Sequence, residues 1–117
     1  MIRFLSKAAA SFVMTDPVAS QVFQALGEEL RIPGIWRVEQ LPAISQKLAE
    51  ALEAAKEQDA RAERALHEAR EKAAAAGETD DLLPRELPVG LSRRLVPVLQ
   101  MVRRAQADSE PVVWERA

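Results

Sequence analysis

Residues 41–76 read LPAISQKLAEALEAAKEQDARAERALHEAREKAAAA, and this stretch decides the fold. It consists almost entirely of Ala, Glu, Lys, Arg, Leu and Gln, which are the strongest helix formers. Pro42 suits the first turn of a helix, and Gly77 suits the left-handed residue that commonly closes one. The sequence therefore predicts one long helix over residues 41–76, with short elements elsewhere that cover its apolar stripe.

The apolar stripe of this helix changes character along its length. Large side chains such as Ile44 and Leu48 lie near its start, whereas later positions carry mostly methyl groups. Its small members are Ala51, Ala55, Ala62, Ala65 and Ala69. Either these alanines let a partner helix approach closely, or the second half projects as a solvated arm held by helix propensity and ion pairs. The solvated arm is slightly favoured, because alanine has little apolar surface to bury.

Length and composition limit the classes of protein. With 117 residues the chain suits one domain with a modest core, and we expect residues 1–117 to form that single domain. The net charge of −2 creates no overall field that would attract nucleic acid or an anionic membrane. The lack of Cys excludes disulfides, thiolate metal sites and Cys nucleophiles, and it fits a reducing compartment.

The sequence contains no apolar run of the roughly 20 residues that a membrane-spanning helix needs. Residues 1–20 only faintly resemble a signal peptide, because Lys7 interrupts the apolar stretch that such a peptide requires. We therefore expect a cytoplasmic protein without a membrane partner.

Two structures stay open for residues 2–15. Strand-forming residues at 2–6 and 11–15 flank a four-residue connection at 7–10, which predicts a β-hairpin. The connection is rich in Ala and lacks the usual Asn-Gly turn signal, so a continuous N-terminal helix is the alternative.

Asp16-Pro17 predicts the start of a helix that runs to about Leu26, with Asp16 as the N-cap and Gly27 closing the helix. Residues 28–37 then form a connection. Pro33-Gly34 predicts a turn there, and we expect Ile35 and Trp36 beyond it to be buried anchors.

The last third of the chain begins with an acidic, Pro-containing loop at residues 77–90. A helix is predicted from 91 to 107, and a short strand over 112–115 that pairs with the N-terminal hairpin and turns Val113 or Trp114 inward. The fold class that follows is a helix-dominated α+β domain, in which strands from the two chain ends carry three helices. An all-α bundle is the alternative.

Short motifs along the chain carry a family resemblance. In order they are Phe4, the run from Ser6 to Ala10, Pro17, Gly27, Gly34-Ile35, Glu39-Gln40-Leu41-Pro42, Pro97-x-x-x-Met101-x-Arg103-Arg104 and Val112-Val113-Trp114. Together they resemble the small bacterial proteins of the domain-of-unknown-function family numbered 1840. The chain departs from that pattern at Arg37, where the family often has a capping Thr, and at Glu115, where it often has Gly. The resemblance implies a compact bacterial cytoplasmic protein, and the family carries no assigned activity, cofactor or catalytic residue to transfer.

His67 is the only imidazole, and Glu63 and Glu71 lie four residues before and after it on the same helix face. A loose metal site or an enzyme centre at His67 is one hypothesis. An exposed helix surface is the simpler interpretation, because metal sites usually bring two or more strong ligands. No Ser lies in a nucleophile-elbow pattern, and no Gly-rich phosphate loop is present. We therefore assign no catalytic, cofactor-binding or metal-ligating residue.

An Arg cluster in the last third of the chain offers a possible patch for anions or an acidic partner. Its members are Arg93, Arg94, Arg103 and Arg104, with Arg85 in the preceding loop. Their pairing with Asp80-Asp81 or with Glu residues of the long helix is the simpler interpretation, because nucleic-acid-binding domains are usually basic overall.

Three functional hypotheses follow from the sequence. The first is a non-catalytic interaction or scaffold protein that uses the long helix to bind itself, as a homodimer, or another protein. The second is a nucleic-acid-associated regulator that uses the Arg cluster, and the third is the His67 site. Protein ranks above nucleic acid as the expected partner.

Overall fold

The computed structural model describes residues 1–77, 87 and 89–117. The elements in chain order are β1 (Ile2–Ser6), β2 (Ala9–Met14), α1 (Asp16–Leu26), β3 (Gly34–Trp36), a short 3₁₀ helix (Val38–Gln40), α2 (Leu41–Ala75), α3 (Leu91–Asp108) and β4 (Val112–Arg116). The helix-dominated α+β fold is therefore confirmed, and the all-α alternative is wrong. The predicted acidic loop at 77–90 lies mostly outside the described residues.

The four strands form one antiparallel sheet in the order β2-β1-β4-β3. The N-terminal hairpin is confirmed, although its turn is shorter than predicted because β2 already begins at Ala9. The C-terminal strand pairs with β1, as expected, and so it joins the two ends of the chain. The sequence-based prediction missed β3, which lies within the expected connection at 28–37.

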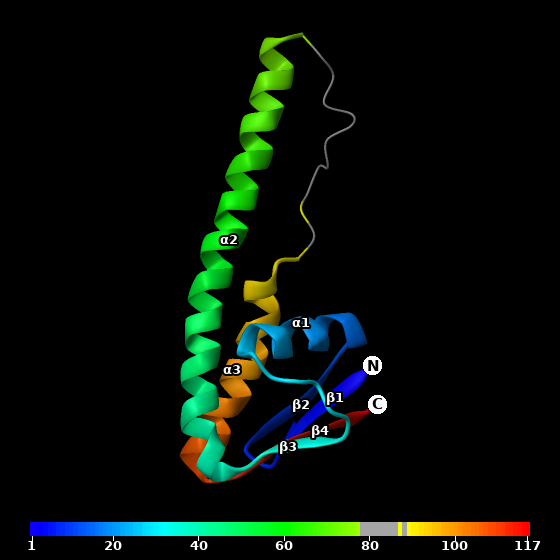
Figure 1. Cartoon of the computed structure of the whole chain (residues 1–117), viewed down its shortest axis with the longest axis vertical. Coiled ribbons are helices and arrows are strands. Elements are labelled where there is room, and N and C mark those ends of the chain that lie inside the picture. Colours follow the sequence, from blue (N-terminus) through cyan, green and yellow to red (C-terminus); the bar gives the residue numbers. More distant parts are fainter. Residues whose placement is uncertain (78–86, 88) are drawn as a thin grey trace.

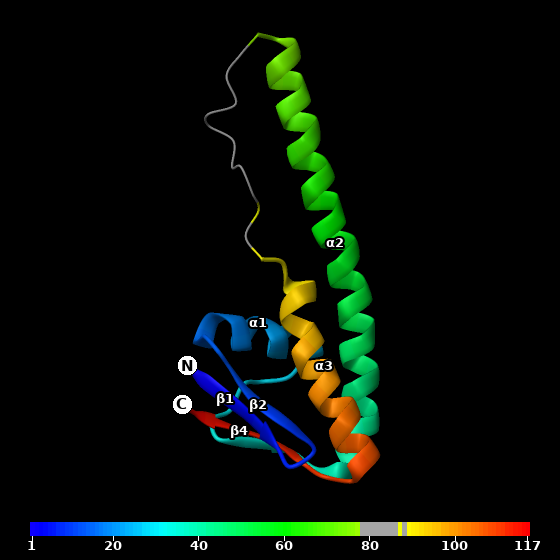
Figure 2. The same cartoon turned by 180° about the vertical axis from the view of Figure 1, so that it is seen from behind.

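Helices α1 and α3 lie on the same side of the sheet (Figures 1 and 2). Residues that alternate along the strands therefore point into the helix layer or away from it. Trp36 is buried as predicted, but Ile35 is 44% exposed, because its neighbour on the strand already points inward. The expectation that both residues are buried anchors is half wrong. Of the two candidates on β4, Trp114 is the buried one.

All five aromatic side chains of the protein gather between the sheet and α1: Phe4, Phe12, Phe23, Trp36 and Trp114. The two Trp rings lie 4.8 Å apart between centroids, and Phe23 of α1 contacts both of them. Trp114 also donates a hydrogen bond of 2.6 Å from Nε1 to the Arg31 carbonyl oxygen, which leaves its polar atom satisfied. The loop before β3 is thereby fixed to β4.

Helix α1 begins one residue earlier than predicted. Thr15 is its N-cap and makes no side-chain capping bond, while Asp16 is the first helical residue. The expected N-cap role of Asp16 is therefore wrong. Its carboxylate instead accepts hydrogen bonds from the Met1 amino group and from the Arg116 guanidinium. Gly27 closes the helix in the left-handed conformation, with φ of 70°, as predicted.

The long helix is confirmed as α2, and its 35 residues span about 52 Å at 1.5 Å per residue. Its first half is the part that enters the core, where the buried residues are Leu41, Ile44, Leu48, Leu52 and Ala55. Helix α3 has 18 residues, spans about 27 Å, and runs beside this first half of α2 (Figure 1). Roughly the second half of α2 therefore extends beyond the start of α3.

Candidate interaction surface

Asp59 marks the point on α2 where the cover provided by α3 ends. Its carboxylate accepts a hydrogen bond of 3.2 Å from the backbone N–H of Ser92 and another of 2.5 Å from the Ser92 hydroxyl. Ser92 is the second residue of α3, so Asp59 supplies the capping group that the N-cap residue Gly90 lacks. This contact fixes the start of α3 against the middle of α2 and leaves the rest of α2 as an arm, residues 60–75.

The structure divides the predicted alanine stripe between the core and the arm. Ala55 is 2% exposed and belongs to the core, and Ala51 is half-buried beside it. Ala62 and Ala65 are exposed, and Ala69 is half-buried. Only these last three alanines lie on the arm. No described helix packs on them, so the part of the stripe that remains accessible is the distal part.

Leu66 is the one large apolar residue on the arm, and it is half-buried. It lines a hollow of about 780 Å³ between the arm and the residues that lead into α3. Ala62 stands beside it on the same wall, and Leu87 and Val89 form part of the opposite wall. The hollow also has charged groups at Glu63 and Arg93, among others. The arm therefore presents a mixed surface, with an apolar centre and charged margins.

A second hollow, of about 640 Å³, lies between α1 and the first half of α2. Gln21 and Gln24 line it from α1, and Ala51 and Ala54 line it from α2. Val89 borders both hollows, so the chain entering α3 separates them along α2. The predicted stripe thus borders two successive depressions instead of one continuous groove.

His67 lies on the arm with its side chain 74% exposed, and its Nε2 is 2.9 Å from Glu71. Glu63 does not complete a ligand set with them. In the described part of the chain, no group of three or more His, Asp or Glu side chains is placed to hold a metal ion. Of Glu63, His67 and Glu71, only His67 and Glu71 therefore contact each other, and they do so on the exposed surface of the helix.

The predicted Arg cluster forms an exposed face of α3. Arg93, Arg94, Arg103 and Arg104 are all exposed, and none of them makes an ion pair with a described acidic residue. Arg93 and Arg104 are three turns apart and share the solvent side, with Arg94 and Arg103 on either flank. The pairing with Glu residues of the long helix is therefore not seen, and Asp80, Asp81 and Arg85 lie outside the described residues.

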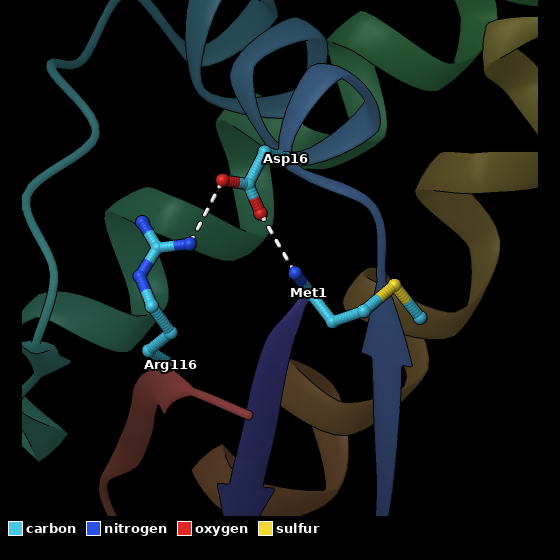
Figure 3. A network of polar contacts seen from close by, with 3 residues as sticks. All are labelled: Met1, Asp16 and Arg116. Carbon is cyan, nitrogen blue, oxygen red and sulfur yellow. Dashed lines mark hydrogen bonds and ion pairs between the residues drawn. The ribbon is translucent and has the colours of Figure 1, made fainter.

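A pair of charge interactions at Asp16 joins the two ends of the chain. Asp16 lies 2.9 Å from the Met1 amino group and 2.8 Å from the Arg116 guanidinium, as Figure 3 shows. The hydrogen bond from Arg116, followed by the one from the amino terminus, lowers the pKa of the Asp16 carboxyl below its ordinary value of 3.8. The three groups are well exposed, so this contact ties β1, β4 and α1 together without forming a buried centre.

Sequence reasoning missed the Asp59–Ser92 contact. The sequence does contain a signal for this contact, because one set of residues on α2 alternates in spacing between four and three. The members of this set are Leu48, Leu52, Ala55, Asp59, Ala62, Leu66 and Ala69. A carboxylate within such an apolar seam needs a polar partner, and here the partner is the exposed start of another helix.

Taken together, the described residues form an α+β fold with a helical arm, and no group of three or more His, Asp or Glu side chains among them is placed to hold a metal ion. The chain matches the family described as Domain of unknown function (DUF1840) over residues 1–114, and it belongs to that family. Comparison with the curated proteins and with the solved structures gave no match. No helix in the described part of the chain is both long enough and apolar enough to cross a membrane.

Proposed function

We propose that this protein is a non-catalytic interaction module and that the arm of α2 is its binding element. The partner is another protein or a second copy of the chain. The proposal rests mainly on the part of α2 beyond Asp59. No other described helix packs against this part of α2. A helix whose apolar residues are left uncovered after folding is a common element of helix-mediated recognition.

The chemistry of the arm supports a protein partner. Ala62 and Ala65 allow another backbone to approach closely, and Leu66 offers a larger apolar contact at the centre. The charged residues around them suit the polar rim that surrounds a typical interface. The non-catalytic part of the proposal rests on the sequence, which lacks Cys and any recognisable nucleophile arrangement.

The test is a pull-down from extracts of the source organism with the full chain as bait, after nuclease treatment and with mass spectrometric readout. The bait carries either the natural sequence or Ala62→Glu together with Ala65→Glu. Ala74→Glu is the matched control, because Ala74 is also an exposed arm alanine but lies off the stripe. A partner retained by the natural chain and by the control, and lost from the double variant, supports the proposal.

Retention of the same proteins by all three baits contradicts the proposal, and so does retention of none together with a monomeric mass at every concentration. A set of proteins that disappears on nuclease treatment points instead to nucleic acid.

A second candidate function rests on the Arg face of α3. Because these guanidinium groups have no acidic partner among the described residues, they are available to bind phosphates or an acidic protein. Binding of a mixed-sequence duplex at low salt that weakens steeply as salt rises, and that is lost on changing Arg103 and Arg104 to Gln, supports this candidate. Absence of binding at low salt removes the nucleic-acid form of it.

A further inference from the structure

The second hollow, between α1 and the first half of α2, has an uncharged lining. Helix α1 reaches toward α2 beside the start of α3 (Figures 1 and 2), and the hollow of about 640 Å³ lies there. None of the described residues around it is charged, although charged residues make up 29% of the chain. Three are glutamines, and the others are Ala, Val or Leu. The volume is within the range of about 300–1,000 Å³ that ligand sites usually have.

The spacing of the lining residues explains why the hollow exists. Gln21 and Gln24 are three residues apart and share the side of α1 that faces away from its buried residues. Ala51, Ala54 and Gln58 follow a spacing of three and four residues along one side of α2. Because alanine side chains are short, they leave the space between the two helices unfilled.

The side chains of Gln21, Gln24 and Gln58 are available to a ligand. All three residues are exposed, and none of their carboxamides makes a hydrogen bond with another described residue. Each carboxamide has two N–H donors and one carbonyl acceptor. Val89, at the end of the hollow next to α3, is 50% exposed and does not pack against the core. It adds an apolar contact to the polar ones.

This lining selects an uncharged ligand that has both donors and acceptors. A charged group placed there would lose water without gaining a counter-charge from the described residues around it. A nucleobase would find no aromatic ring among these residues on which to stack. A peptide group is uncharged and offers one N–H donor and one carbonyl acceptor, which are complementary to a glutamine carboxamide. The chemistry of the hollow therefore fits the backbone of an extended peptide.

We propose that the hollow binds an extended, uncharged peptide segment of another protein. Gln21 and Gln24 of α1 and Gln58 of α2 form hydrogen bonds with its backbone amides, while its side chains contact the alanines and Val89. The site uses no residue of the arm of α2, residues 60–75. This proposal and the proposed function of the arm therefore stand or fall independently.

The test measures the binding of the full chain to an array of end-blocked hexapeptides made of uncharged residues. A matched array carries one Glu or Lys in each peptide. We expect the natural chain to bind a subset of the uncharged peptides and to bind their charged counterparts at least about tenfold more weakly. Binding of no uncharged peptide, or equal binding of the charged counterparts, overturns the proposal.

Paired glutamine variants show whether the bound peptides occupy the hollow. Gln24→Leu together with Gln58→Leu removes one carboxamide from each helix, and Gln46→Leu is the matched control, because Gln46 is an exposed glutamine of α2 outside the hollow. The loss of two hydrogen bonds should weaken binding by about tenfold or more, and the control should stay within about twofold. Circular dichroism confirms that the variants keep the fold. Equal binding by the natural chain and the double variant overturns the proposal.

Two further readouts locate the peptide without relying on the leucine variants. In NMR spectra of the natural chain, the side-chain NH₂ signals of Gln21, Gln24 and Gln58 should move when the strongest uncharged peptide is added, and those of Gln46 should not. The chain with Ala62→Glu and Ala65→Glu, which alters only the arm, should bind this peptide as the natural chain does. Movement of the Gln46 signals alone, or loss of binding in the arm variant, overturns the proposal.

Discussion

The carboxylate of Asp59 on α2 caps the start of α3 by accepting hydrogen bonds from the backbone N–H and the hydroxyl of Ser92. Residues 33 positions apart in the chain are thus joined where the two helices part. The carboxylate approaches Gly90 so closely that a Cβ built on that residue would lie 2.2 Å from its Oδ2. Because the φ of Gly90 is −73°, the glycine is needed for space and not for its backbone conformation.

The cap predicts coupled effects at Asp59 and Gly90. Asp59→Ala removes the capping acceptor and should lower the free energy of unfolding by about 1–2 kcal/mol. Gly90→Ala should also destabilise the protein, because its methyl group displaces the carboxylate. In the Asp59→Ala background the same Gly90 change should have a much smaller effect, since the obstructing group is gone. Urea denaturation of the four proteins measures this coupling, and additive effects would contradict the described contact.

Gly34 should tolerate no side chain. A Cβ at this position would lie 2.2 Å from the Trp114 ring, which forms part of the core. Gly34→Ala must therefore shift the Trp114 ring or β3, and overpacking of this kind costs about 1–3 kcal/mol. Denaturation followed by Trp fluorescence measures the loss of stability, and a changed emission maximum of the folded state reports the moved indole. An unchanged free energy of unfolding together with an unchanged emission maximum would contradict the described packing of the Trp114 ring against Gly34.

The tie at Asp16 predicts a specific dependence of stability on pH. The pKa of Asp16 is lowered in the folded state, first by Arg116 and then by the Met1 amino group. A lowered pKa means that the folded protein favours the ionised carboxyl, so the stabilisation is complete above 3.8 and is lost as pH falls through the folded value. Asp16→Asn should thus lower the melting temperature at neutral pH.

The difference between the natural protein and the Asp16→Asn variant should begin to shrink as the pH falls below 3.8, where the unfolded chain takes up its proton, and should be lost once the pH is below the lowered pKa of the folded state. Thermal melts at a series of pH values measure this difference. Arg116→Met should give the same trend in reduced form, because the amino terminus still contacts the carboxylate. A difference that stays constant across the acidic range would contradict the tie.

His67 should contribute little to stability. Its side chain is 74% exposed and its only described contact is the exposed Glu71, so His67→Ala should change the free energy of unfolding by no more than about 0.5 kcal/mol. Zinc titration of the natural protein and of the variant, read by calorimetry, tests the metal hypothesis directly. Tight binding to the natural protein that is lost with His67 would restore that hypothesis.

The sequence was most informative where composition and periodicity agreed over many residues. The predicted helix at 41–76 differs from α2 by one residue at its end, because strong helix formers fill the whole stretch. The hairpin at 2–15 and the strand after Pro111 were also predictable, since β-branched and aromatic residues are concentrated in each run. Strand β3 has only three residues, which is too few for alternation to show, and so it was assigned to a connection.

The parts that could not be predicted depend on contacts between distant residues. Nothing local distinguishes Ile35 from Trp36 as the inward residue, because the pairing of β3 with β4 decides that orientation. The division of the alanine stripe between core and arm likewise depends on where α3 begins. The capping contact between Asp59 and Ser92 sets that point, although the two residues are far apart in the sequence.

The most direct measurement of the central proposal is photo-crosslinking from the arm in extracts of the source organism. Ala65→Cys carries a photoactivatable group on the stripe, and Ala74→Cys carries the same group on the exposed helix side away from it. If the arm is the binding element, position 65 should give a discrete crosslinked product, either a doubled chain or one particular protein, and position 74 should not. The absence of a product at 65, or the same products from both positions, would contradict the proposal that this protein binds through its arm.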